Sequence, residues 1–266
     1  MQVIKDKTLF LLDMDGTIYH ENTLIPGAFE FLNTLKMQGK NYVFMTNNSS
    51  KSKFAYIEKL NGLGIVADES NIASSVNSTI AYMNKHKAGA RIYLVGTQSF
   101  REELEKEDFK VVSSSYSGDD IDYVLVGFDT ELTYEKIEKA CYHINRGKEF
   151  IATNIDLRCP VRDNKFIPDC GAICNMITAA VNIEPLYLGK PAKELIFAVS
   201  YLHNIPLDNM MCIGDRLYTD IACGINAGIT TGVVFTGEAK PEDLVNTQFM
   251  PDFQFESIAD LYDIIK

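Results

Sequence analysis

The stretch Thr8-Leu9-Phe10-Leu11-Leu12-Asp13-Met14-Asp15-Gly16-Thr17 decides the fold. Its first half, Thr8–Leu12, is apolar apart from one hydroxyl group and predicts a buried strand. Side chains two residues apart on an extended chain point to the same side, so Asp13 and Asp15 are expected to face one site. Gly16 then permits a sharp turn. Because open α/β sheets bind ligands at the carboxyl ends of their strands, we expect a polar site at this edge.

Short apolar runs alternate with helical periodicity along the rest of the chain. Further strands are expected over Asn41–Met45, Leu186–Leu188, Met210–Ile213 and Gly232–Phe235. Helices are expected from Pro26, with Phe29, Leu32 and Leu35 on the apolar face, and over Ser52–Leu60, Ala192–Leu202, Thr219–Asn226 and Ile258–Ile265. This alternation predicts an α/β fold, a parallel sheet with helices on both faces.

The middle of the chain shows the same kind of pattern. Strands are expected over Arg91–Val95, Val111–Ser113, Tyr123–Phe128 and Phe150–Thr153, with helices over Ser99–Lys106 and Tyr134–Asn145 between them. These elements either continue the first sheet or form a second domain, and composition alone does not decide between the two.

Composition narrows the classes of partner. The chain has 25 basic and 36 acidic residues, a net charge of −11, which disfavours binding to nucleic acid and to anionic membranes. No apolar run approaches the roughly 20 residues that span a bilayer, and the first residues lack the order of a signal peptide. Six cysteines without a CxxC pair fit a reducing compartment, so we expect a cytoplasmic protein. A phosphate substrate would require a local positive charge.

Two more predicted strands end in chemically useful groups. Thr46-Asn47-Asn48-Ser49-Ser50 offers a hydroxyl, amides and backbone N–H groups before a helix, a set that suits an anion and equally a helix cap. Met210–Ile213 delivers Asp215, a hard oxygen ligand for Mg²⁺, with Asp220 five residues later. Lys190, between Gly189 and Pro191, supplies a positive charge if it is fixed there.

Taken in order, these motifs resemble the haloacid dehalogenase-like (HAD) hydrolase superfamily over essentially the whole chain. The chain is more narrowly similar to the NagD-like, or 4-nitrophenylphosphatase-like, group. That narrower match rests on Thr46-Asn47-Asn48-Ser49, Ala152-Thr153-Asn154-x-Asp156, Cys170-Gly171-Ala172 and Gly189-Lys190-Pro191. The resemblance implies a Rossmann-like core over residues 1–79 and 180–266, with an inserted α/β cap of type IIA over residues 80–179.

The resemblance also implies a role for each matching residue. Asp13 is the nucleophile, and Asp15 is the general acid and base. Thr46, the backbone of Asn47 and Lys190 hold the phosphoryl oxygens. The implied cofactor is Mg²⁺, and its implied ligands are a carboxylate oxygen of Asp13, the carbonyl of Asp15 and a carboxylate oxygen of Asp215. Asp220 is expected to support these ligands without binding the ion.

In the family, the cap helps to select the leaving group of the substrate. Here the stretch Thr153–Gly171 is expected to contribute, through Asn154, Asp156, Arg158, Arg162 and Gly171. For each arginine, an exposed loop charge is an equally good interpretation. The expected partner is a small phosphorylated metabolite: a sugar phosphate, a nucleoside monophosphate or an aryl phosphate. The resemblance also leaves room for a homodimer formed through the cap.

The main prediction is therefore a Mg²⁺-dependent phosphatase, and other functions stay open. A phosphomutase shares the aspartyl-phosphate intermediate but retains phosphate in organic form. A catalytically idle phosphate-binding regulatory protein is a further alternative, against which the intact set of motifs argues. A dehalogenase is disfavoured because it has no leaving alkoxide for Asp15 to protonate.

Overall fold

A computed structural model describes residues 1–161 and 165–266, which divide into two compact units. The first unit comprises Met1–Thr46, Lys53–Ala73 and Lys190–Lys266, and the second comprises Asn47–Ser52 and Ser74–Gly189. The predicted insertion, residues 80–179, lies inside the second unit. That unit extends further on both sides, because it takes in the whole of helix α4 (Ser75–Lys87) and strand β12 (Leu186–Tyr187).

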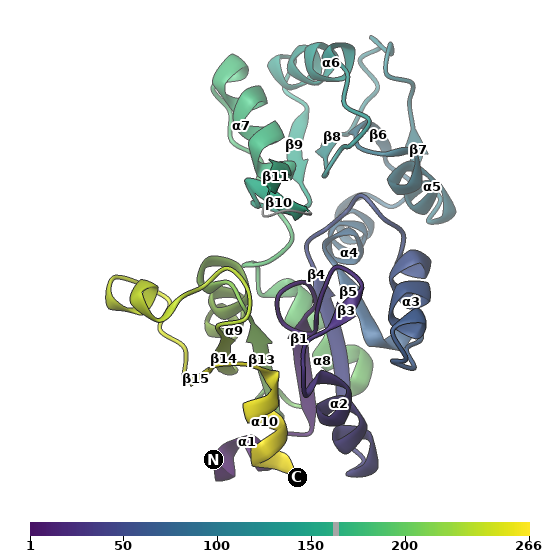
Figure 1. Cartoon of the computed structure of the whole chain (residues 1–266). Helices are drawn as coiled ribbons and strands as arrows, with labels where there is room; N and C mark the ends of the chain where they lie inside the picture. The colour runs from purple at the N-terminus through teal and green to yellow at the C-terminus, as the bar shows by residue number, and fades with distance from the viewer. Residues whose placement is uncertain (162–164) are drawn as a thin grey trace. The chain divides into compact units, whose positions relative to one another are not determined.

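The first unit is built on a six-stranded sheet (Figure 1). In spatial order its strands are β15 (Phe253–Phe255), β14 (Thr230–Val234), β13 (Met210–Gly214), β1 (Leu9–Asp13), β4 (Asn41–Thr46) and β5 (Ile72–Ser74). β1 lies in the centre and pairs in parallel with β13 and with β4. The carboxyl ends of these three strands therefore meet at one edge, as the sequence pattern predicts.

Helices cover both faces of this sheet because β1 is apolar on both sides. Phe10 and Leu12 pack in one hydrophobic cluster with α2 (Ala28–Met37), α3 (Lys53–Gly62) and α10 (Ile258–Ile265). Leu9 and Leu11 pack in another with α8 (Glu194–His203) and α9 (Ala222–Ala227). The first unit also contains α1 (Gln2–Lys5), the short pair β2 (Tyr19–His20) and β3 (Thr23–Leu24), and the 3-10 helices Glu69–Asn71, Leu207–Asn209 and Pro241–Val245. The predicted α/β fold is confirmed.

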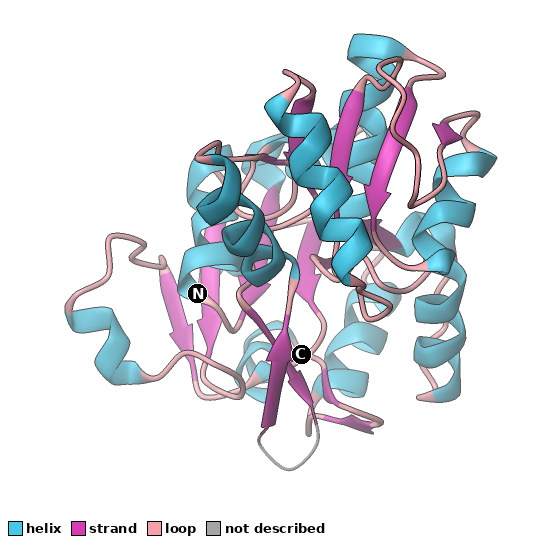
Figure 2. Ribbon diagram, turned by 90° about the horizontal axis from the view of Figure 1, so that it is seen from above, coloured by secondary structure: helices cyan, strands magenta, loops and turns pink. Residues whose placement is uncertain are grey.

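The second unit has its own sheet and its own core. Its strand order is β12, β9 (Glu149–Ala152), β8 (Tyr123–Val126), β6 (Arg91–Val95) and β7 (Lys110–Val111), all pairs being parallel. α6 (Tyr134–Asn145) and α7 (Cys170–Val181) share one hydrophobic cluster with it, and α4 and α5 (Gln98–Lys106) share the other. β10 (Arg158–Val161) and β11 (Lys165–Pro168) form a separate antiparallel pair. Figure 2 shows helices alongside both faces of the strands.

Two sequence expectations about elements were wrong, and a third was right in place but not in helix type. The helix expected from Pro26 begins at Ala28, and Phe29 is half exposed while Ala28, Phe31, Leu32 and Leu35 are buried. The strand near Leu186 pairs with β9 in the second sheet and not with the first sheet. The helix expected from Thr219 begins as a π-helical turn over Leu217–Ile221, a feature common near functional sites.

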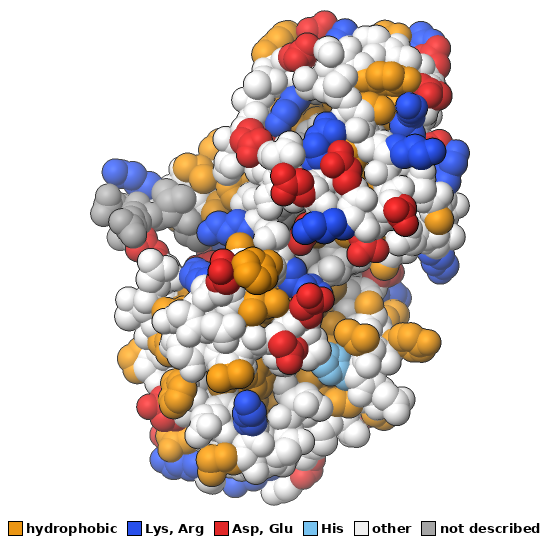
Figure 3. Space-filling model, turned by 90° about the vertical axis from the view of Figure 1, so that its right-hand side faces the viewer, with side chains coloured by type: hydrophobic (Ala, Val, Ile, Leu, Met, Phe, Trp, Pro, Cys, Tyr) orange, Lys and Arg blue, Asp and Glu red, His pale blue; other side chains and the backbone are white. Residues whose placement is uncertain are grey.

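The surface shows no gathering of the acidic excess on the face drawn in Figure 3. Acidic and basic side chains are interspersed there, and hydrophobic side chains lie in small groups. All six cysteines are free thiols. No helix in the described part of the chain is long and apolar enough to cross a membrane. The cytoplasmic location stays a prediction.

Candidate active site

The centre of the site is a buried lysine between two aspartates of the first unit. Lys190 Nζ lies 2.6 Å from Asp13 Oδ1 and 2.6 Å from Asp220 Oδ1. It also donates to the carbonyl of Met45, near the end of β4, at 3.3 Å. Only 3% of the Lys190 side chain is exposed. Three strand ends and the residue after Gly189 therefore converge, as the sequence motifs predict.

Asp215 completes an acidic cluster at the end of β13. One oxygen each from Asp13, Asp215 and Asp220 lie within 4.8 Å of one another. Asp215 is buried, and its Oδ2 accepts a hydrogen bond from the backbone N–H of Glu238 at 2.7 Å. Its Oδ1 is buried with no hydrogen-bond partner among the described residues. A buried polar atom without a partner is costly, so this oxygen is suited to a ligand that the protein itself does not supply.

A divalent cation fits this arrangement. Hard cations such as Mg²⁺ bind through carboxylate and carbonyl oxygens, and the unpartnered Asp215 Oδ1 is such a donor. Asp220 is less suited to bind a metal directly, because Lys190 occupies its Oδ1 and the N–H of Arg216 donates to its Oδ2 at 3.1 Å. Asp13 and Asp215 are therefore the carboxylates that would hold the ion.

The pKa values of the clustered groups are shifted because like charges are buried close together. Burial is the largest effect that raises the pKa of Asp13 well above its usual range; Lys190 opposes it, while Asp220 and Asp215 reinforce it. Burial, reinforced by Asp220, raises the pKa of Asp215 to about 7. Burial alone would lower the pKa of Lys190, but its ion pairs with Asp13 and Asp220 outweigh that effect and raise the pKa. Without a cation, the cluster favours a protonated carboxyl group.

Asp15 is placed differently from the other predicted acids. Its side chain is more than half exposed, and its Oδ1 lies 4.0 Å from Lys59 Nζ on α3. Lys59 Nζ also lies 3.7 Å from the centre of the Tyr19 ring, which is itself buried. Lys59 was missed in the sequence because a lone lysine on a helix has no distinguishing signal. Asp15 is thus accessible to water, whereas Asp215 and Asp220 are buried.

Thr46 and Asn47, the predicted phosphate-binding residues, follow from β4. Thr46 is its last residue, and Asn47 is the next residue and the first of the second unit. Both are buried. Thr46 thus lies one residue after Met45, whose carbonyl accepts from Lys190.

A segment after β14 was missed by sequence reasoning. Glu238 N holds Asp215, and Thr236 Oγ1 donates to the carbonyl of Gly16 at 2.6 Å. A Cβ on Gly237 would lie 2.0 Å from Asp215 Oδ2, so only glycine permits this close approach. Gly16 has a φ of +93°, and a Cβ there would also approach Asp215 Oδ2 at 2.7 Å. The signal for Gly16 was its place in the first motif, whereas Thr236-Gly237-Glu238 resembles an ordinary turn.

The Arg216 side chain forms an ion pair with Glu238, in the segment after β14. Its Nε lies 3.1 Å from Glu238 Oε2. Tyr218 OH also donates to Glu238, at 3.2 Å. Arg216 thereby supports the residue whose backbone N–H holds Asp215, and its charge lowers the pKa of Asp215 against the larger effect of burial.

The residues predicted to select the substrate lie in the second unit. Asn154 and Asp156 are buried, and Gly171, in the first turn of α7, donates its N–H to the Asp156 carbonyl at 2.8 Å. Arg158 is exposed on β10, with its guanidinium 4.6 Å from the centre of the Phe166 ring. Arg162 falls outside the described residues. A substrate contact by these residues stays a prediction.

Comparison with known proteins agrees with this geometry. A sequence profile described as haloacid dehalogenase-like hydrolase matches residues 10–110, and a second, HAD-hydrolase-like profile matches residues 187–261. The chain is 31% identical to the 5'-nucleotidase YutF of Bacillus subtilis over 251 residues, covering 94% of this chain and 96% of that protein.

The chain belongs to the haloacid dehalogenase-like hydrolase family. It is a phosphatase of the NagD-like group within that family. It is 32% identical to an acid sugar phosphatase of Staphylococcus aureus, covering 97% of this chain and 99% of the relative. The 4-nitrophenylphosphatase of Thermotoga maritima superposes with a TM-score of 0.93 at 38% identity, over 99% of both chains. NagD from E. coli gives a TM-score of 0.85 at 29% identity, over 96% of this chain and 98% of that one.

Proposed function

We propose that this phosphatase is Mg²⁺-dependent and hydrolyses small phosphate monoesters through an aspartyl-phosphate on Asp13. The observation that carries the proposal is the position of Lys190 Nζ, 2.6 Å from Asp13 Oδ1, in a cluster with Asp215 and Asp220. A single lysine does not balance three carboxylates and a phosphate dianion. Mg²⁺ held by Asp13, Asp215 and the carbonyl of Asp15 would supply the missing positive charge and neutralise the phosphoryl oxygens.

In the first step, a carboxylate oxygen of Asp13 attacks phosphorus and the bond from phosphorus to the ester oxygen breaks. Asp15 gives its proton to that oxygen, so the leaving group departs as an alcohol. Lys190, the hydroxyl of Thr46 and the backbone N–H of Asn47 bind the phosphoryl oxygens. The ion pair with Lys190 favours the ionised form of Asp13 but does not outweigh burial, which raises the pKa of Asp13, so a bound cation would be needed to favour the ionised nucleophile further.

In the second step, water replaces the alcohol beside Asp15. Asp15, now ionised, takes a proton from the water while the water oxygen attacks phosphorus. The bond from phosphorus to Asp13 breaks, and inorganic phosphate and the original carboxylate are restored. The exposure of the Asp15 side chain supports this role, because both the alcohol and the water must reach it.

The second unit is proposed to be the inserted type IIA cap. The names of the relatives indicate a broad class of substrate and not a single compound. Relatives named for 5'-nucleotides, for sugar phosphates and for 4-nitrophenyl phosphate align over nearly the whole chain. We therefore propose a small phosphorylated metabolite as the substrate, drawn from nucleoside monophosphates, sugar phosphates or aryl phosphates.

The test is release of inorganic phosphate by the purified full-length protein. p-Nitrophenyl phosphate, a hexose phosphate and a nucleoside 5'-monophosphate are each assayed with Mg²⁺, with EDTA, and with EDTA followed by excess Mg²⁺. We expect release with Mg²⁺, loss with EDTA and recovery on adding Mg²⁺ back. Asp220→Asn is a useful comparison, because it removes the charge of the second partner of Lys190 without removing a proposed metal ligand.

Two outcomes would overturn the proposal. Retention of phosphate in organic form, with a shifted position on a sugar, would indicate a phosphomutase. Binding of inorganic phosphate without turnover of any ester on the panel would indicate a phosphate-binding regulatory protein.

A further inference from the structure

The carboxyl end of the second sheet is occupied by the chain itself. In open α/β sheets this edge is where ligands bind. Here the segment Asn47–Ser52, which directly follows Thr46, lies against it. Three groups just beyond the ends of β6, β8 and β9 bond this segment: Thr97 Oγ1 to the Ser50 carbonyl (3.3 Å), Phe128 N to Ser49 Oγ (2.8 Å) and Thr153 Oγ1 to Ser49 Oγ (3.0 Å). The polar groups of this edge are thus engaged within the protein.

The carbonyl oxygen of Asn47 accepts hydrogen bonds from two side chains of the second unit. Asn154 Nδ2 donates to it at 2.6 Å, and Ser75 Oγ, at the start of α4, donates to it at 2.7 Å. A carbonyl oxygen has two lone pairs, so these two donors satisfy it fully. Two buried donors on one oxygen restrict rotation of the Asn47 backbone.

Both the amide nitrogen and the amide oxygen of the Asn154 side chain form hydrogen bonds within the second unit. The side chain is fully buried. While its Nδ2 donates to Asn47, its Oδ1 accepts from the backbone N–H of Asp156 at 3.0 Å. Gly189 comes close to the same place: a Cβ there would lie 2.7 Å from Asn47 Oδ1 and 2.3 Å from the Thr153 carbonyl. The residues next to Thr46 and next to Lys190 therefore pack together within the second unit.

We infer that Asn154 is a positioning residue for phosphate binding, acting through the Asn47 carbonyl, and is not a contact for the leaving group. The inference rests on the proposed function, in which Thr46, the Asn47 N–H and Lys190 hold the phosphoryl group. By fixing the backbone at Asn47, Asn154 and Ser75 set the direction of the adjoining phosphate-binding groups. Small displacements of such groups lower catalysis strongly.

The test replaces the donor while keeping the shape. Asn154→Asp places an oxygen where Nδ2 now donates. We expect kcat/KM to fall roughly ten- to hundredfold, by the same factor for p-nitrophenyl phosphate and for a hexose phosphate. The Kd of inorganic phosphate with Mg²⁺, measured by calorimetry, should rise in parallel. Ser75→Ala removes only the second donor to the same carbonyl and should produce a smaller change in the same direction.

The control is a variant that weakens the same unit elsewhere. Thr133 caps α6 through a hydrogen bond from Lys136 N and, among the described residues, makes no hydrogen bond to Asn47–Ser52. Thr133→Ala should lower the unfolding temperature yet leave kcat/KM and the phosphate Kd unchanged. If it reduced both as much as Asn154→Asp does, Asn154 would be merely structural.

Two other results would overturn the inference. An Asn154→Asp variant with wild-type kcat/KM and phosphate Kd would remove the positioning role. A loss that differs between leaving groups, with an unchanged phosphate Kd, would make Asn154 a substrate contact. Failure of the proposed function is a separate result, seen as a wild-type protein that binds phosphate but releases none from any ester; the phosphate Kd still tests the role of Asn154 in that case.

Discussion

The two units share one architecture but differ in the polar groups that follow their strands. Each is built on parallel strands with helices on both faces. In each, polar groups follow the carboxyl ends of the strands. In the first unit those groups are charged: Asp13, Asp215 and Asp220 surround Lys190. In the second they are mostly neutral hydroxyl and amide groups, and they bond to the chain's own segment Asn47–Ser52.

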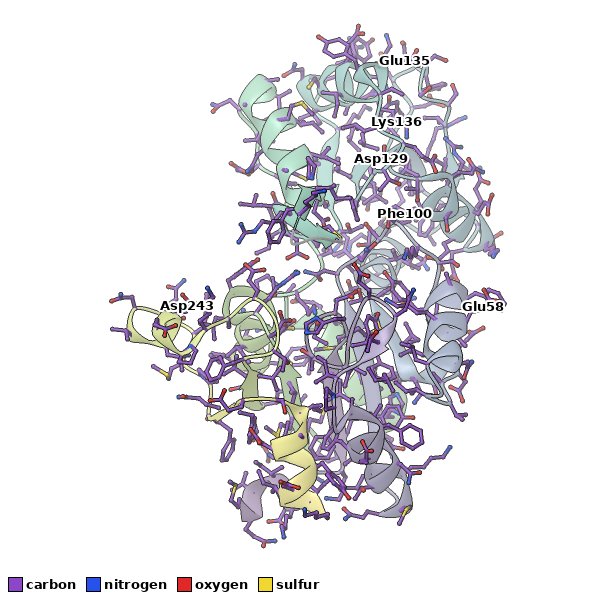
Figure 4. All side chains as sticks on the ribbon, viewed as in Figure 1. Glu58, Phe100, Asp129, Glu135, Lys136 and Asp243 are labelled. Atoms are coloured by element: carbon purple, nitrogen blue, oxygen red, sulfur yellow. The ribbon has the colours of Figure 1, made fainter. Side chains whose placement is uncertain are left out.

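The two sheet edges differ in the partners of their buried acids. In the second unit a buried acid is also present, but Asp129 is paired with Lys136 at 2.8 Å and accepts from Glu131 N (Figure 4). In the first unit one oxygen of Asp215 has no hydrogen-bond partner among the described residues. The clustered carboxylates of the first unit are suited to bind a cation and, with Lys190, a phosphate; the hydroxyl and amide groups of the second unit hold part of the protein in place.

The largest expected effect comes from removing the proposed nucleophile at the charged edge of the first unit. Asp13→Asn keeps the shape of the side chain and removes its charge, so kcat should fall by at least about 10³-fold because no aspartyl-phosphate forms. Steady-state assays with p-nitrophenyl phosphate measure this, and unfolding in urea serves as the control for folding. Near-normal turnover in this variant would show that the first unit's charged edge does not perform the chemistry.

Local sequence patterns predict some residues of this edge, whereas others depend on contacts between segments far apart in the chain. Asp13 and Asp215 each follow an apolar strand, and Lys190 stands beside a glycine and a proline, so local patterns identified all three. Their convergence needs the parallel order of β4, β1 and β13, which strand and helix alternation predicts. Asn154 was also identified, but its burial and its bond to Asn47 depend on a contact between segments 107 residues apart.

Other features had no local signal. Phe29, Leu32 and Leu35 recur at helical spacing, but the buried face consists of Ala28, Phe31, Leu32 and Leu35, and Phe29 lies outside it because burial depends on which face meets the sheet. Leu186 was apolar enough for a strand, but sequence gives no rule for which sheet a two-residue strand joins. Gly237 is required by contact with Asp215, and such a requirement is visible only in three dimensions.

A second prediction concerns the charge balance itself. Lys190→Met removes the cation from between Asp13 and Asp220 and leaves buried carboxylates uncompensated, so the free energy of unfolding in EDTA should fall by about 3–5 kcal/mol. Adding Mg²⁺ should recover part of this loss, because a bound cation returns positive charge to the same cluster. Urea unfolding with and without Mg²⁺ measures both effects.

The matched variant for that prediction is the double replacement of Lys190→Met with Asp220→Asn. It removes one buried carboxylate together with the lysine, and it should therefore be more stable in EDTA than Lys190→Met alone. Equal stability of the single and double variants would contradict the view that uncompensated charge causes the loss.

A third prediction follows from the pKa of Asp215. The ordinary value of 3.8 is raised to about 7 in the folded state by burial. Between these values the folded protein keeps a proton that the unfolded chain has lost, so the free energy of unfolding in EDTA falls as pH rises from about 4 to 7. The interval corresponds to at most about 4 kcal/mol. Asp215→Asn lacks this titration, so its stability relative to the wild type should increase across the window; parallel pH curves for the two proteins would contradict the assignment.

The smallest expected effect completes the comparison in the second unit. Lys136 Nζ contacts Asp129 and also donates to the carbonyls of Gly96 and Glu131. Lys136→Met should lower the free energy of unfolding by about 2 kcal/mol, since the charge-assisted bond to Asp129 and the bonds to two carbonyls are lost while Asp129 keeps its bond from Glu131 N. Because this edge lacks the clustered carboxylates of the first unit, the loss should be the same with Mg²⁺ as with EDTA. A Mg²⁺-dependent loss here would mean that the ion also acts on the second unit, and the contrast between a cation-binding edge and an edge that binds the chain's own segment would fail.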